Sequence, residues 1–238
     1  MSKCVAIITA RGGSKRIYKK NIKEFCGKPI IAYSIQAALE SEIFDEVMVS
    51  TDDKEIAEVA QKYGAKVPFF RSPKTSDDYA TTKDVLLEVV DTYKKMGKEF
   101  EYMCCIYPTA PFITSDKLKQ AFDALITNNG EQTMTVVQYS FPPQRCNIIN
   151  SDGVLEYKFP ENRLRRSQDL QAWYHDAGQF YFYDVQKFIK VDGMCEKIIP
   201  LVVSELEVQD IDNEIDWQIA EMKYRVMGKK GVINKEDG

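Results

Sequence analysis

Short apolar runs alternate with amphipathic stretches along most of the chain. Runs rich in β-branched residues predict buried strands at 4–8, 46–50, 66–70, 102–106, 133–139, 178–182 and 197–203. Apolar residues at helical spacing predict helices at about 30–39, 54–63, 83–95, 115–127 and 213–227. Strands that alternate with helices imply a mostly parallel sheet covered on both faces. We therefore expect an α/β protein with a three-layer α/β/α, Rossmann-like fold.

The alternation breaks between residues 140 and 174. Strand-like pieces at 146–150 and 154–159, joined at Ser151-Asp152-Gly153, predict a small hairpin inserted into the fold. Such an insert commonly serves as a dimer arm or as a lid, and the sequence does not choose between the two. We expect residues 1–228 to form a single domain and residues 229–238 to be a frayed tail.

Composition narrows the class of protein. The chain has 238 residues, of which 44% are hydrophobic and 29% charged, as in an ordinary globular domain. The sequence shows no long apolar segment and no secretion signal, so we expect no membrane association. Six cysteines without a C-x-x-C pair favour a reducing, cytoplasmic setting. The net charge of -4 argues against nucleic-acid binding.

Positive charge is concentrated in the loop after the first strand. Residues 10–21 read A-R-G-G-S-K-R-I-Y-K-K-N, and residues 11–23 carry six Lys or Arg and no acid. The two glycines allow a sharp turn that exposes backbone N–H groups, as an anion-binding nest requires. The loop also follows the carboxyl end of a strand, where open α/β sheets bind ligands. We interpret it as a site for a nucleoside triphosphate; a solvated basic loop is the alternative.

The second candidate is the segment Asp210-Ile211-Asp212. In a strand, both carboxylates would point to one side while Ile211 packs into the core. Paired carboxylates without nearby histidine or thiolate ligands favour Mg²⁺. In the alternative interpretation, Asp212 is a helix N-cap and Asp210 a surface residue.

These motifs resemble those of a known family. The R-G-G-S-K loop and the D-I-D segment are similar to signatures of the CMP-sugar synthetases that activate nonulosonic acids, the sialic acid and pseudaminic acid cytidylyltransferases. Thr9 and Tyr18 stand where this family commonly has proline. The string Y-H-D-A-G-Q-F-Y at 174–181 resembles the pseudaminic acid branch more than the sialic acid branch. The likeness extends from the first strand to about Met227.

The resemblance implies an activity and a site. CMP would pass from CTP to the anomeric hydroxyl of a nine-carbon keto-sugar acid, most closely pseudaminic acid, and pyrophosphate would leave. The catalytic residues would be Arg11, Lys15, Lys20, Asp210 and Asp212, with Mg²⁺ held by the two aspartates. The nucleotide would contact Ala10, Arg11, Gly12, Gly13, Ser14, Lys15, Lys20, Asn21, Arg71, Asp78, Ala80 and Thr82. The sugar would contact Tyr107, Thr109, Arg163, Arg165, Arg166, His175, Asp176, Gln179 and Tyr181.

Several alternatives stay open. The sugar could be sialic acid or 3-deoxy-octulosonate, or the enzyme could use UTP or GTP with a sugar phosphate. A non-catalytic nucleotide-binding protein of the same fold is a further alternative. His175, the one histidine of the chain, also suits a structural role. The expected partners are CTP, the sugar acid and a second copy bound through residues 140–174, and neither nucleic acid nor membrane.

Overall fold

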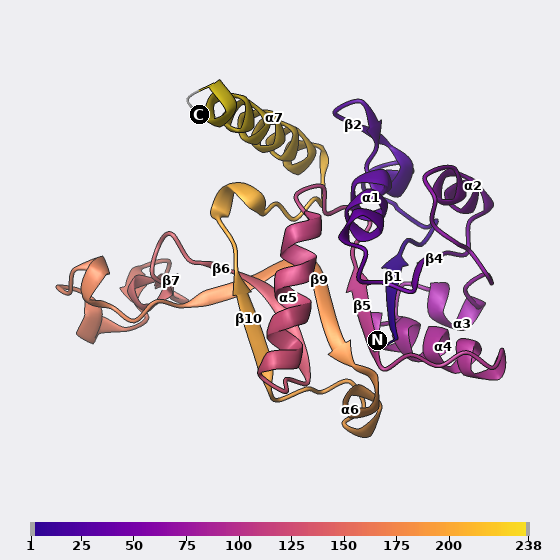
Figure 1. The fold of residues 1–238 in the computed structure, drawn as a ribbon. Coiled ribbons are helices and arrows are strands. Elements are labelled where there is room, and N and C mark those ends of the chain that lie inside the picture. Colours follow the sequence, from indigo (N-terminus) through magenta and orange to yellow (C-terminus); the bar gives the residue numbers. More distant parts are fainter. Residues whose placement is uncertain (1–2, 237–238) are drawn as a thin grey trace.

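The computed structural model describes residues 3–236, with side chains described as far as residue 228. Its centre is a six-stranded sheet in the order β10-β6-β9-β5-β1-β4 (Figure 1). The strands are β1 (Cys4–Thr9), β4 (Glu46–Ser50), β5 (Tyr102–Ile106), β6 (Gln132–Gln138), β9 (Tyr174–Asp184) and β10 (Ile198–Val202). Strand β9 runs antiparallel to β5 and β6, whereas the other pairs are parallel. The expected mostly parallel sheet is confirmed.

Helices cover both faces of this sheet, which confirms the three layers. Helices α1 (Ile31–Ser41), α2 (Lys54–Lys62) and α5 (Ser115–Thr127) contribute to the core on one face, and α4 (Thr82–Lys95) and α6 (Val185–Lys190) to the core on the other. Successive side chains of each strand point to opposite faces of the sheet, so each strand contributes side chains to both cores. In β5, Cys104 belongs to the first core and Cys105 to the second, and both are fully buried.

One predicted strand is wrong. Residues 66–70 form no strand, because the pairing with β4 stops after a single bridge between Lys66 and Met48. Pro68 has no N–H to continue the ladder, and the chain turns away beyond it. The chain comes back to the end of β4 at Arg71, whose N–H donates to the Thr51 carbonyl 2.8 Å away. The short helix α3 (Pro73–Ser76) then leads toward α4.

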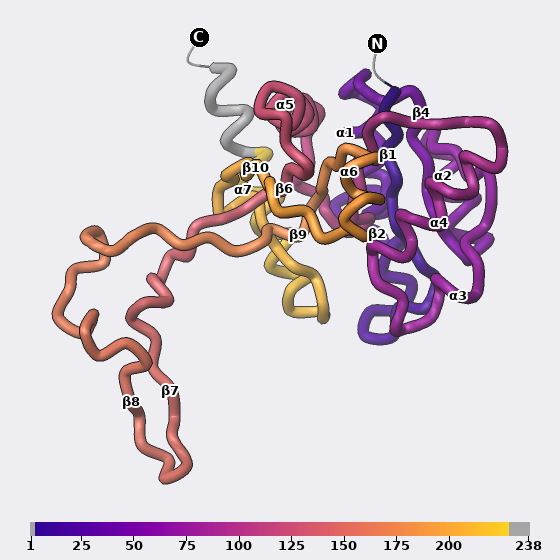
Figure 2. Tube along the Cα trace, turned by 90° about the horizontal axis from the view of Figure 1, so that it is seen from below, coloured from indigo at the N-terminus to yellow at the C-terminus, as the bar shows by residue number. Residues whose placement is uncertain are grey.

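The predicted hairpin is present and extends from the body of the molecule. Strands β7 (Asn147–Ile149) and β8 (Leu155–Tyr157) pair in antiparallel register. Residues 140–173 leave the sheet after β6 and return at β9, and Figure 2 shows them as an arm that projects away from the sheet. The arm also holds three short 3-10 turns, at Pro143–Arg145, Pro160–Asn162 and Ser167–Asp169.

A small apolar cluster joins the region after the basic loop to the final helix. The final helix α7 (Glu214–Glu236) buries Trp217 against Phe25, which lies between the basic loop and α1. Ile17 and Ile211 complete the contact, so the segment before α7 is held beside the basic loop. Phe25 ends the short strand β2 (Glu24–Phe25), which follows the 3-10 turn Lys20–Ile22 and pairs with β3 (Lys28–Pro29).

Helix α7 is longer than the sequence predicts. It continues past the expected end near Met227 as far as Glu236, so most of the segment 229–238 has helical backbone, and residues 237–238 lie outside the described residues. Another 3-10 turn, Glu205–Glu207, lies between β10 and α7. Within residues 3–236, no helix combines the length and the apolar character that a membrane crossing requires.

Candidate active site

A cavity of about 550 Å³ opens at the carboxyl ends of β1 and β5, between the basic loop and the start of α4. This is the edge at which open α/β sheets bind ligands. Its walls come from distant parts of the sequence, including the segment before α7. The lining residues are Thr9, Arg11, Gly13, Ser14, Lys15, Arg16, Ile17, Lys20, Asn21, Arg71, Asp78, Ala80, Thr82, Val85, Tyr107, Pro108, Thr109 and Asp212.

Each of the six cations of the basic loop lies next to a carboxylate. Arg11 and Lys15 contact Asp78, at 2.7 and 2.5 Å. Arg16 and Lys20 lie 2.8 and 3.9 Å from Asp212. Away from the cavity wall, Lys19 contacts Glu55, and Lys23 lies 2.7 Å from Glu214. The six cations of the loop thus share four carboxylates and keep an excess of positive charge, and an anionic ligand would compete with Asp78 and Asp212 for four of these cations.

Asp212 faces the cavity because neighbouring side chains cap the helix in its place. The Asn213 carboxamide oxygen accepts from the N–H groups of Ile215 and Asp216, at 2.9 and 3.0 Å. The Asp216 carboxylate accepts from the N–H groups of Asp212 and Asn213, at 2.9 and 3.1 Å. The interpretation of Asp212 as the N-cap is therefore wrong, and its carboxylate is directed to Arg16 and Lys20.

Of the two interpretations of the D-I-D segment, the strand is also wrong. Residues 208–213 belong to neither a strand nor a helix, because no neighbouring strand pairs with them. Ile211 is buried, as expected, at 1% exposure. Asp212 lines the cavity, but Asp210 is exposed and is not among the lining residues.

Lys20 joins the basic loop to this segment. Its ammonium donates to the Ile211 carbonyl at 2.7 Å and lies 3.9 Å from the Asp212 carboxylate. Burial lowers the pKa of Lys20 below its usual value, against the opposite effect of the Asp212 and Asp210 carboxylates. The contact places a partly buried cation at the cavity wall.

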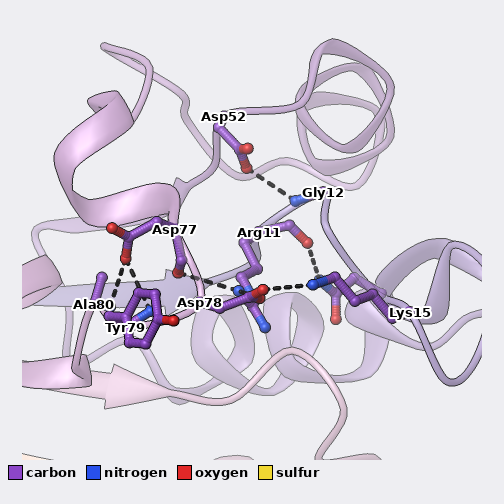
Figure 3. Close-up of polar contacts among 9 residues, drawn as sticks. Arg11, Gly12, Lys15, Asp52, Asp77, Asp78, Tyr79 and Ala80 are labelled. Carbon is purple, nitrogen blue, oxygen red and sulfur yellow. Dashed lines mark hydrogen bonds and ion pairs between the residues drawn. The ribbon is translucent and has the colours of Figure 1, made fainter.

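The glycines of the loop act differently from the expected nest. Neither Gly12 nor Gly13 has a positive φ. The Gly12 N–H donates to the Asp52 carboxylate at 2.9 Å (Figure 3). The Ser14 N–H donates to the Gly12 carbonyl at 2.9 Å. These two N–H groups are therefore engaged within the protein. Side-chain cations, more than backbone N–H groups, give the loop its positive surface.

Arg71 adds a buried cation to the cavity wall. Its guanidinium is almost fully buried and donates to the side chain and the carbonyl of Ser50, at 3.1 and 2.7 Å. Burial lowers the pKa of Arg71 below its usual value, while Asp52 and Glu88 act in the opposite direction. The bonds to Ser50 involve Nε and one terminal nitrogen, so the second terminal nitrogen is left for a ligand.

Tyr107 lines the cavity between Thr82 and β9. Its hydroxyl lies 3.4 Å from the Thr82 hydroxyl, and its ring packs edge-on against Tyr181. Burial raises the pKa of Tyr107. Tyr181 in turn donates to the Asp176 carboxylate at 2.7 Å. The predicted residues Tyr181 and Asp176 thus support Tyr107 and do not themselves line the cavity.

Other predicted residues also lie away from the cavity wall. Ala10 is buried in the core, and Gly12 lines a smaller cavity behind the loop. Gln179 is buried and donates to the Glu207 carbonyl, whereas His175 is exposed, with its ring beside Tyr139. The arginines of the arm bind within the arm: Arg163 lies over the Tyr157 ring, and Arg165 and Arg166 contact Asp169.

The cavity is also lined by residues that were not predicted from the sequence to belong to the site. Arg16 carries one of the six charges of the basic loop, but only the structure shows that it faces Asp212. Val85 lies one turn after Thr82 on α4, and Thr9 ends β1. Val85 could have been identified from its helical spacing to Thr82, and Thr9 from its position at the end of the first strand.

The family follows from comparison with known proteins. The profile of the family described as cytidylyltransferase matches residues 5–190, which include the basic loop and Arg71. The chain belongs to the cytidylyltransferase family.

Curated relatives of this cytidylyltransferase cover nearly the whole chain. It is 42% identical to the pseudaminic acid cytidylyltransferase of Campylobacter jejuni serotype O:2, over 94% of this chain and 97% of that protein. It is 34% identical to the CMP-N,N'-diacetyllegionaminic acid synthase of Legionella pneumophila, over 91% and 94%. A solved CMP:2-keto-3-deoxy-manno-octonic acid synthetase complexed with CTP shares the fold, with a TM-score of 0.68, 17% identity, and coverage of 96% of this chain and 100% of that one.

The cavity of the cytidylyltransferase offers the carboxylate of Asp212 to a metal ion that would take its other ligands from phosphate. No three His, Cys, Asp or Glu side chains gather as a metal-binding group in the part of the chain that the structure describes. Mg²⁺ in nucleotide sites commonly takes one or two carboxylates together with phosphate oxygens. Asp212 fits this pattern because it lines the cavity, and both of its ionic contacts use the oxygen Oδ1.

We expect Gly12→Ala to lower the stability of the protein by about 1–3 kcal/mol. A Cβ at residue 12 would lie 2.8 Å from the Asp53 carboxylate and 2.9 Å from its Cβ. Asp53 caps α2, so its displacement would also disturb that helix. Urea denaturation measures the change. Gly13→Ala is the matched control, because its Cβ would meet nothing within 4 Å. Equal losses in the two variants would contradict the explanation.

Proposed function

We propose that this cytidylyltransferase transfers CMP from CTP to pseudaminic acid and releases pyrophosphate. The observation that carries the choice of sugar is the 42% identity to a pseudaminic acid cytidylyltransferase, against 34% to a relative named for a different sugar. The cavity supports the chemistry, because it combines the cations of the basic loop with Asp212 and Arg71. A purely non-catalytic nucleotide-binding protein would have no need for Asp212 at this position.

The charges of the cavity suggest how CTP lies. The triphosphate would contact Arg11, Lys15, Arg16 and Lys20, which line one wall. The free terminal nitrogen of Arg71 would donate to the carbonyl of the cytosine ring. Thr82 and the backbone at Ala80 would lie near the ribose, since they line the same cavity as Arg71. The nucleotide would thus extend from Arg71 toward the basic loop.

The reaction needs positioning and charge stabilisation more than covalent help from the protein. The anomeric oxygen of the sugar attacks the α-phosphorus, and the bond from that phosphorus to the bridging oxygen of pyrophosphate breaks. The hydroxyl proton passes to solvent. Lys20 and Arg16 would stabilise the charge that develops on the phosphates. Mg²⁺ held by Asp212 would, when bound, neutralise phosphate charge and lower the pKa of a coordinated hydroxyl.

The sugar would bind at the end of the cavity formed by Tyr107 and Thr109. Its carboxylate needs a cation, and the arm carries Arg163, Arg165 and Arg166. Since the arm projects away from the sheet of its own chain, we propose that it reaches the site of a second copy in a homodimer (Figure 2). Exposed apolar side chains on the arm, among them Ile149 and Leu155, support such a contact.

The proposed location of the enzyme is the cytoplasm, as the cysteine content of the sequence predicts.

A panel of substrates tests the proposed function. The enzyme is incubated with Mg²⁺ and CTP, UTP or GTP, together with pseudaminic acid, sialic acid, legionaminic acid or 3-deoxy-octulosonate, and the products are weighed by mass spectrometry. We expect CMP-pseudaminate and pyrophosphate to form fastest. A faster reaction with another sugar would correct the substrate, and no pyrophosphate with any sugar would refute the enzymatic function.

Replacement of Asp212 tests the metal assignment. Asp212→Ala should lower kcat by about a hundredfold or more and raise the Mg²⁺ concentration needed for half-maximal rate, because a cavity carboxylate is lost. The fold should persist, since no core volume is removed. Asp210→Ala should cost less, because Asp210 does not line the cavity. Asp91→Ala, an exposed change on α4, is the control. Normal turnover of Asp212→Ala would refute the assignment.

The oligomeric state tests the role of the arm. We expect the wild-type protein to sediment as a dimer and Ile149→Asp to sediment as a monomer, because a charge would be placed in the proposed apolar contact. Met194→Asp is the matched control, since both side chains are 73% exposed but Met194 follows α6. A monomeric wild-type protein in analytical ultracentrifugation would rule out the proposed dimer.

A further inference from the structure

Asp78 occupies an unusual position for a residue in a phosphate site. Its two carboxylate oxygens each accept from a different cation, Oδ1 from Arg11 at 2.7 Å and Oδ2 from Lys15 at 2.5 Å (Figure 3). A phosphate group would use the same donors in the same way. Asp78 also lines the cavity, opposite the basic loop. The carboxylate therefore lies where the anionic end of CTP would bind.

Local structure fixes the backbone around Asp78. The Asp77 carboxylate accepts from the N–H groups of Tyr79 and Ala80, at 2.9 and 2.7 Å, and closes a tight turn. The Asp77 carbonyl accepts a further bond from Arg11, at 3.1 Å. Directly after the turn, Thr81 and Asp84 form the capping box of α4. The turn is thus attached directly to α4, which fixes the position of the Asp78 backbone relative to the cavity.

We infer that Asp78 is a specificity-determining residue that competes with the polyphosphate for Arg11 and Lys15. The inference rests on the proposed function, because it requires the triphosphate to bind at the basic loop. Asp78 stays ionised when a ligand arrives, since the hydrogen bonds from Lys15 and then Arg11 lower its pKa. Any anion must therefore displace the carboxylate and overcome its repulsion.

This competition selects for highly charged ligands. A triphosphate offers several anionic groups to the four cations and can replace Asp78, whereas a monophosphate offers one. After the transfer, Asp78 returns to Arg11 and Lys15 and helps to expel pyrophosphate. Asp212 differs in this respect, because a metal ion would convert its negative charge into an attraction for phosphate. The two carboxylates of the cavity would thus have opposite effects on nucleotide affinity.

The direction in which Asp78→Asn changes the affinity for CTP separates this role from its alternative. If Asp78 accepts hydrogen bonds from the ribose, as an ordinary nucleotide ligand, then its replacement weakens CTP binding. If it competes with phosphate, then Asp78→Asn strengthens binding, because the amide keeps the shape but loses the charge. The gain should be confined to ligands that reach Arg11 and Lys15 with a polyphosphate.

Isothermal titration calorimetry of the full-length protein supplies the test, with inorganic pyrophosphate, CTP and cytidine as ligands. We expect Asp78→Asn to bind pyrophosphate and CTP about tenfold more tightly than the wild type, and cytidine equally. The gain should shrink at high ionic strength, since the site is exposed to solvent. Inhibition of turnover by pyrophosphate should strengthen by a similar factor. Asp91→Asn, which removes an exposed charge from α4 outside the cavity, should leave all three affinities unchanged.

The outcomes distinguish failure of this inference from failure of the proposed function. Unchanged or weaker pyrophosphate binding by Asp78→Asn, with normal binding by the wild type, would overturn the competing role and leave the proposed function intact. Tighter binding of cytidine as well would also overturn it, because the effect would not concern phosphate. Absence of both CTP and pyrophosphate binding in the wild type would instead overturn the proposed function.

Discussion

The contact between Lys20 and the segment 211–212 is the interaction on which the site depends. It joins residues near the two ends of the chain, and an ionic contact at 3.9 Å does not by itself hold such distant segments in place. The apolar cluster of Ile17, Phe25, Ile211 and Trp217 provides that stability. The electrostatics of the cavity are therefore a consequence of hydrophobic packing between the basic loop and α7.

Much of the fold is predictable from the sequence because most of its strands are buried on both faces. Such strands appear as compact apolar runs, and β1, β4 and β5 lie where those runs predict them. The failure at 66–70 has a local cause, since Pro68 ends the pairing that Lys66 begins. The antiparallel direction of β9 is not visible in its sequence. It depends on where the arm returns the chain to the sheet.

The site is predictable where one motif determines it and not where tertiary contacts do. The basic loop is a local pattern, and Arg11, Lys15 and Lys20 line the cavity as a group. The D-I-D pattern does not reveal that Asn213 and Asp216 take over the capping and leave Asp212 facing the cavity. The residues predicted to contact a sugar are the least well placed by the sequence, because β9 directs Tyr181 and Asp176 behind Tyr107 and away from the cavity wall.

The reversed direction of β9 has a consequence for how this architecture can diversify. The last residue of β6, Gln138, pairs with the first residue of β9, Tyr174, so both roots of the arm lie at the same edge of the sheet as the cavity. Insertions or deletions between these roots change the length and reach of the arm and leave the strand register as it is. The arm can therefore diversify by loop exchange at a single point of insertion, without any change to the sheet or to the cavity lined by the basic loop.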